Sequence, residues 1–127
     1  MPGRLPQNPP FRFVDRVLES DPPRRCVTLK VFSTDEILLE GAGGVPASLV
    51  IEALCQSAAF LQGDAAPGRG RIALIEEVEI TGEVEIGDRL LVTATLLEEG
   101  AAALKAESRA EVDGKPVARL TVLIQRG

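Results

Sequence analysis

Residues 44–57 read GVPASLVIEALCQS, an almost continuous apolar run that contains one carboxylate, Glu52, and one amide, Gln56. A carboxyl group can take or give a proton, so Glu52 is the first candidate for chemistry. On a helix, Ser48, Glu52 and Gln56 are four residues apart and share one face. Burying an unpaired carboxylate is costly, so Glu52 must face water or find a partner, such as Gln56 one turn on. Spacing alone leaves a solvated stripe and a functional site equally open.

The complete absence of histidine removes several kinds of site. None of the 127 residues is histidine, which excludes Ser-His-Asp catalysis, Cys-His catalysis and histidine-ligated metal sites. Cys26 and Cys55 form neither a metal-ligand spacing nor a disulfide framework. Each lies in an apolar run, so we interpret both as small buried side chains. We therefore expect no metal and no cofactor.

Composition indicates one soluble globular domain over residues 1–127, with 45% hydrophobic and 26% charged residues. No apolar stretch reaches the roughly 18 residues that a membrane span needs. The N-terminus has no apolar signal-peptide core, so we expect a cytoplasmic protein without membrane contact. A net charge of −5 and the absence of Trp and Tyr argue against a nucleic-acid partner.

Turn signals and periodicity predict the elements that hold the stripe. The glycine-rich residues 41–44 lead to Pro46, a residue favoured in the first helical turn, and the helix should run from there to about residue 62. Gly63 is its expected stop. Strands are predicted at residues 13–20, 25–32, 71–82, 90–98, 102–112 and 116–126, with VDGK as a hairpin turn. The sequence therefore predicts an α+β fold in which an antiparallel sheet curls around one long central helix.

Four motifs, in order along nearly the whole chain, resemble one enzyme family. GGVPASLVIEALCQSAAF resembles the central-helix motif of the 3-hydroxyacyl-acyl-carrier-protein dehydratases of fatty-acid biosynthesis, and Pro46, Glu52 and Gln56 stand at its proline, acidic and glutamine positions. LPQNPPFRFVDRVLE resembles the family's L-P-H-x-x-P-F-x-x-V-D-R-V. EIGDRLLVTATLLE resembles the P-G-D-x-L strand start, and VDGKPVA the final hairpin. The short GGVPA step is most similar to dehydratase-like proteins of aryl-polyene-type acyl pathways.

The resemblance implies a hotdog fold that forms homodimers, or higher oligomers of dimers, with an acyl thioester of acyl carrier protein or coenzyme A in a tunnel between two chains. It implies that Glu52 is catalytic and that Gln56 supports it. The substrate-binding residues that it implies are Gly43, Gly44, Val45, Ala47 and Ser48, with Gln7, Asn8 and Phe11 near the tunnel mouth. A tight loop before the helix and a plain turn at residues 7–8 remain alternative explanations of the glycines and of Gln7 and Asn8.

The chain departs from the family at its catalytic histidine. The family's G-H-F-P-G loop corresponds here to EGAGG, with Gly41 and Ala42 about where Gly-His would stand, and Gln7 replaces the histidine of L-P-H. Dehydration requires both a base and an acid, whereas thioester hydrolysis needs one carboxylate and the N–H groups of residues 45–48. Three functions follow: a dehydratase-like lyase, a single-carboxylate acyl thioesterase, or a non-catalytic acyl-binding or partner subunit.

Overall fold

The computed structural model describes residues 15–32, 44–62 and 71–125. Within them the chain forms two strands, a helix with a short 3-10 turn, and four more strands. The elements are β1 (Arg16–Asp21), β2 (Arg25–Val31), α2 (Ala47–Ala59), η2 (Phe60–Gln62), β3 (Arg71–Ile80), β4 (Arg89–Glu99), β5 (Ala103–Val112) and β6 (Lys115–Gln125). The predicted order of elements is confirmed. The predicted helix stop, Gly63, and the outer ends of the first and last predicted strands lie outside the described residues.

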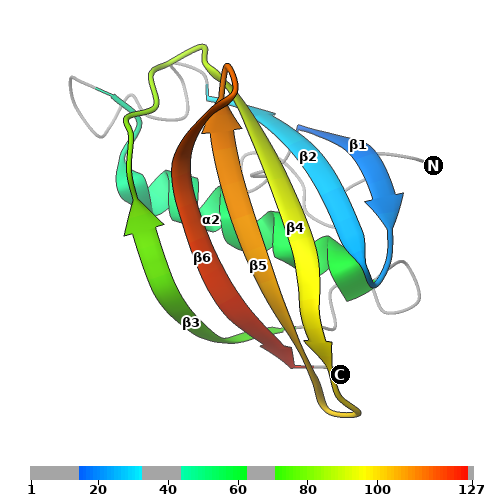
Figure 1. Cartoon of the computed structure of the whole chain (residues 1–127). Coiled ribbons are helices and arrows are strands. Elements are labelled where there is room, and N and C mark those ends of the chain that lie inside the picture. The colour runs from blue at the N-terminus through cyan, green and yellow to red at the C-terminus, as the bar shows by residue number, and fades with distance from the viewer. Residues whose placement is uncertain (1–14, 33–43, 63–70, 126–127) are drawn as a thin grey trace.

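All six strands form one antiparallel sheet in the order β1-β2-β4-β5-β6-β3. The sheet curves around α2, which crosses behind it in Figure 1. The connection from β2 through α2 to β3 carries the chain from one end of the strand order to the other. The α+β arrangement that the sequence predicted, a sheet wrapped around one long helix, is therefore confirmed.

The β5–β6 hairpin forms at the predicted Asp-Gly step. Asp113 and Gly114 have φ angles of +51° and +80°, and Val112 pairs with Lys115 across the turn. A two-residue hairpin turn of this kind needs a positive φ at both central residues, which glycine and, less readily, aspartate adopt. This turn fixes the register of the two longest-paired strands of the sheet.

The core lies between the concave face of the sheet and α2. Along β4, Leu90, Val92 and Ala94 are buried and alternate with less buried residues, as the period of a strand on a helix requires. The helix contributes small side chains as well as large ones, which lets it approach the sheet closely. Its fully buried apolar residues are Ala53, Leu54 and Ala58, and Leu61 follows in η2.

Three buried hydroxyl groups connect α2 to the sheet. The Thr28 and Ser57 hydroxyls are 2.5 Å apart, and Ser57 also donates to the carbonyl of Ala53, at 2.9 Å. Ser108 on β5 donates to the carbonyl of Leu54, also at 2.9 Å. In a low-dielectric core such bonds have strict geometry. They fix the rotation of α2 about its axis, and with it the direction in which the stripe points.

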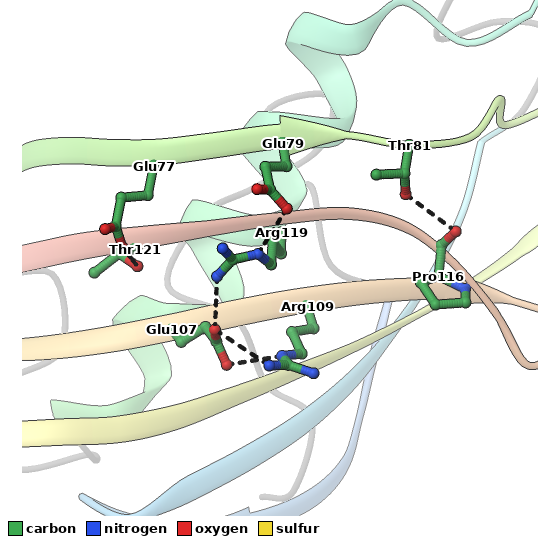
Figure 2. Close-up of polar contacts among 8 residues, drawn as sticks. All are labelled: Glu77, Glu79, Thr81, Glu107, Arg109, Pro116, Arg119 and Thr121. Carbon is green, nitrogen blue, oxygen red and sulfur yellow. Dashed lines mark hydrogen bonds and ion pairs between the residues drawn. The ribbon is translucent and has the colours of Figure 1, made fainter.

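A ladder of ion pairs crosses the convex face of the sheet, on the side turned away from α2 (Figure 2). Arg119 on β6 donates to Glu79 on β3, at 2.9 Å, and to Glu107 on β5, at 3.0 Å. Arg109 completes the ladder with a bond of 2.8 Å to Glu107. The hydrogen bond and charge of Arg119 lower the pKa of Glu79. These contacts hold β3 to β6 beside a bulge where the register shifts between Glu76 and Glu79.

Strand β3 has apolar side chains on a free edge of the sheet. It is the last strand in the order, so no described strand pairs with its outer edge. Ile75 and Ile80 pair with Val122 and Ala118, which are buried beneath α2, yet the two isoleucines are 40% and 45% exposed. Exposed edges rich in apolar residues are where strands of other chains add.

Among the described residues, no helix is both long and apolar enough to span a bilayer.

Candidate functional site

The polar stripe predicted from the sequence lies on the face of α2 that the sheet leaves uncovered. Ser48 and Glu52 are exposed and Gln56 is half-buried, whereas the opposite face of the helix packs into the core. The prediction that the three residues share one face is confirmed. Among the described residues, the sheet covers the apolar face of the helix and leaves the polar stripe exposed.

Gln56 does not hold Glu52 in the way that the spacing suggested. No hydrogen bond joins the two side chains, and Glu52 has no ion pair with any described residue. Both side chains reach the surface, where water competes for their polar atoms. Glu52 is therefore an exposed carboxylate that no described side chain engages.

The two buried cysteines, Cys26 and Cys55, have thiol pKa values above the ordinary value. Burial, and then the negative charge of Glu52, raise the pKa of the Cys55 thiol to about 11. Burial, and then Glu19, raise the pKa of Cys26 to about 11 as well. Both thiols are protonated at neutral pH and are poor nucleophiles. The interpretation of both cysteines as small buried side chains is confirmed.

These raised pKa values predict a loss of stability in alkali. An unfolded thiol ionises near pH 9.0 and the folded one near pH 11, so above pH 9 the unfolded state releases protons first. The free energy of unfolding should fall by about 2 kcal/mol per thiol as the pH rises from 9 to 11. Urea denaturation across this pH range measures the fall. In the Cys26→Ala/Cys55→Ala variant the fall should be smaller by the contributions of the two thiols. Equal falls in the wild type and the variant would show that ionisation of these thiols does not cause the loss of stability.

The start of α2 is held against the loop that follows β3. The N–H of Val45 donates to the carbonyl of Val84 at 2.7 Å. A Cβ on Gly44 would lie 2.8 Å from the same carbonyl, so only glycine allows this approach. Pro46 is the residue before the helix and has no N–H to donate. The chain therefore meets the sheet at a fixed angle as it begins the helix.

The N–H groups of Ala47 and Ser48 have no acceptor among the described residues. The first bonds of the helix run from Leu49 and Val50 to the carbonyl of Pro46, and no side chain caps the helix. Helix starts leave such donors open, and the helix dipole favours negative charge there. Of the N–H groups near residues 45–48 that were expected to polarise a carbonyl, that of Val45 is bonded to Val84, and those of Ala47 and Ser48 remain.

A cavity of about 230 Å³ lies at this end of the helix. Gly44, Val45, Ala47 and Val50 line it from the helix side. From the sheet side it is lined by residues that the sequence did not single out, Ile80, Gly82, Glu83 and Val117 among them. Gly82 and Glu83 belong to the GEVEIGD stretch and Val117 to the final hairpin motif, and their distance from residue 44 along the chain gave no sign that they meet it in space.

The cavity brings together part of the predicted site. Gly44, Val45 and Ala47 line it, whereas Ser48, Glu52 and Gln56 are on the adjoining stripe and do not. Gly43, Gln7, Asn8 and Phe11, also predicted to bind substrate, lie outside the described residues. The candidate site thus consists of a small, mostly apolar cavity, two open N–H groups, and a carboxylate on the next turn of the helix.

A curved antiparallel sheet wrapped around one helix is the arrangement of the hotdog fold. No protein-family model matches the chain. The 3-hydroxyacyl-[acyl-carrier-protein] dehydratase FabZ of Ruminiclostridium cellulolyticum is 31% identical over 121 residues, which cover 90% of this chain and 85% of that protein. The chain belongs to the family of 3-hydroxyacyl-[acyl-carrier-protein] dehydratase-like proteins.

Solved structures show the same fold at much lower sequence identity. The dehydratase heterocomplex ApeI:P from Xenorhabdus doucetiae superposes with a TM-score of 0.77 at 15% identity, covering 97% of this chain and 88% of that one. A hypothetical thioesterase with coenzyme A from Streptococcus pneumoniae TIGR4 superposes with a TM-score of 0.75 at 9% identity, covering 88% and 84%. These likenesses establish the hotdog fold of the chain.

Proposed function

We propose that this protein is a dehydratase-like enzyme of fatty-acid or polyketide-type metabolism in the cytoplasm, acting on acyl thioesters of acyl carrier protein or coenzyme A. The observation that carries the proposal is the position of Glu52. Among the described residues nothing pairs with this carboxylate or with the N–H groups of Ala47 and Ser48, which lie about one turn before it at the cavity end of α2. Similarity to FabZ proteins over most of the chain supports the substrate class.

In this proposal the start of α2 polarises the thioester carbonyl, and the polar stripe transfers the proton. The N–H groups of Ala47 and Ser48 donate hydrogen bonds to the thioester carbonyl oxygen and stabilise the negative charge that develops on it. This makes the C2 proton more acidic. Glu52, in its protonated form, gives a proton to the departing 3-hydroxyl group, and in its ionised form takes one back in the reverse reaction. Gln56 lies beside the leaving water on the same face of the helix.

The working form in this proposal is a homodimer, or a higher assembly of dimers, built through β3. The exposed apolar side chains of β3 lie at the end of the strand order, and β3 contacts α2, whose polar stripe is exposed. A second chain added there covers both. It removes Glu52 from bulk water, which strengthens its interactions with a bound thioester.

Two alternatives rest on specific observations. A lone carboxylate beside open helix N–H groups is enough for thioester hydrolysis, and a hypothetical thioesterase shares the fold. The absence of histidine instead favours a non-catalytic subunit that binds acyl groups or pairs with a histidine-bearing partner, as a heterocomplex would allow.

One substrate panel separates the three functions. The purified full chain is given 3-hydroxyacyl, 2-enoyl and saturated acyl thioesters, each on acyl carrier protein and on coenzyme A. Interconversion of the first two, followed by the absorbance of the enoyl thioester, supports a dehydratase. Release of free thiol supports a thioesterase. Binding by calorimetry without any turnover would exclude both enzymes and favour the binding subunit.

A further inference from the structure

The cavity at the start of α2 contains one ionisable side chain that neither the sequence motifs nor the proposed function uses. Of the residues that line it, Glu83 alone can titrate; the others are glycine, alanine, valine and isoleucine. Glu83 is exposed, so its carboxylate lies at the rim of the cavity, with apolar walls behind it. Titratable groups at the mouth of an apolar cavity are candidates for proton transfer.

The main chain on both sides of Glu83 is fixed. Gly82 donates its N–H to the carbonyl of Val117 on β6, at 3.1 Å, and Val84 accepts the N–H of Val45, at 2.7 Å. A Cβ on Gly82 would lie 3.0 Å from the Cγ1 of Val117, so glycine is what brings this loop close to the sheet. Glu83 is therefore held between the sheet and the start of the helix. A proton-transfer group needs such a rigid support.

Glu83 also differs from the carboxylates of β3, which are engaged by other described residues. Glu79 is engaged by Arg119, Glu77 by Thr121, and Glu76 by Lys105. No ion pair or side-chain hydrogen bond to Glu83 occurs among the described residues. Ala47, whose N–H is open, lines the same cavity. Ala47 at the helix start and Glu83 thus border the same small cavity.

We infer that Glu83 is the second proton-transfer residue of the site and performs the base step for which this chain has no histidine. The inference rests on the proposed dehydratase function. The Glu83 carboxylate takes the C2 proton of a 3-hydroxyacyl thioester, and the electron pair of the C2–H bond becomes the C2–C3 double bond. The C3–O bond breaks as protonated Glu52 gives its proton to the oxygen. Enoyl thioester and water leave, and a proton passing from Glu83 to Glu52 through solvent restores both groups.

Glu85 provides a matched control, since it carries the same charge two residues along the same loop. Its carboxylate would be 3.5 Å from a Cβ on Gly44, close to the helix start, but it does not line the cavity. Its backbone N–H is bonded to the carboxylate of Asp88 at 2.8 Å. Glu83→Gln and Glu85→Gln therefore remove equal charge from neighbouring places, only one of which borders the cavity.

The test measures enoyl-thioester hydration and its reverse, with full pH profiles, for the wild type and both variants in their native assembly. Glu83→Gln should lower kcat by a factor of about 10² to 10⁴ with an unchanged Tm and nearly unchanged thioester affinity. Its residual kcat/KM should lose the acidic limb that belongs to the base. Glu85→Gln should stay within a few-fold of wild type.

The outcomes separate this inference from the proposed function. If Glu83→Gln keeps wild-type kcat and the acidic limb, Glu83 is not the base, while the dehydratase function stands. An equal loss in both variants would point to a general effect of loop charge and would also overturn the inference. If the wild type turns over no thioester in the panel, the proposed dehydratase function fails, and the role of Glu83 fails with it.

Discussion

Glu52→Gln is expected to lower the turnover of the best thioester substrate at least about 100-fold while leaving the protein folded. The amide has nearly the shape of the carboxyl group but can neither give nor take a proton. Because Glu52 is exposed and makes no ion pair with a described residue, the change removes no stabilising contact. Steady-state kinetics give the loss, and thermal denaturation should give an unchanged Tm.

A control and an independent structural readout accompany this variant. Glu98→Gln removes an exposed carboxylate on β4 and should keep full activity. Since the charge of Glu52 contributes to the raised pKa of Cys55, Glu52→Gln should also lower that pKa slightly, with burial still the larger cause. A rate of Cys55 alkylation against pH measures this. Wild-type turnover in Glu52→Gln would show that Glu52 is not part of the chemistry.

The fold followed from local patterns where the pattern itself sets the geometry. The alternation of Leu90, Val92 and Ala94 with more exposed residues identified β4, and Asp113-Gly114 identified the final hairpin. Both depend on side-chain period or backbone φ, which neighbouring residues determine. The bulge in β3 could not be predicted in this way. Its register shift depends on partners in β6, about 40 residues away along the chain.

The sequence predicted which site residues share a face of the helix, but not which residues of other elements lie next to that helix. Spacing placed Ser48, Glu52 and Gln56 on one face, but which face meets the sheet is decided by contacts such as that of Ser108 with the carbonyl of Leu54. The cavity was harder to predict than the stripe. Glu83 and Gly44 are brought together only by the hydrogen bond between Val45 and Val84. A motif reveals residues that are neighbours in sequence, whereas a site assembles residues that the sheet makes neighbours.

In solution the protein is expected to be a dimer, or a multiple of one, paired through β3, and the double variant Ile75→Lys/Val78→Lys is expected to be a monomer. Four large apolar side chains of this strand are 40% to 48% exposed: Leu74, Ile75, Val78 and Ile80. Covering what remains exposed of each stabilises a dimer by about 1 kcal/mol per side chain, and backbone pairing of the two edges adds to this. Two lysines there would instead bury unpaired charges on one strand of each chain.

Leu97→Lys is the matched control for the lysine variant, because Leu97 is 50% exposed on β4 and is remote in strand order from the β3 edge. It should leave the mass in sedimentation-equilibrium experiments unchanged. The monomeric double variant should also lose thioester turnover. Without the second chain, Glu52 is exposed to bulk water, which weakens the electrostatic interaction of its carboxylate with the thioester. A monomeric wild type, or a double variant that keeps the dimer, would contradict pairing through β3. A monomer with full activity would show that one chain alone completes the site, and the cavity at the start of α2 would then be the whole binding site.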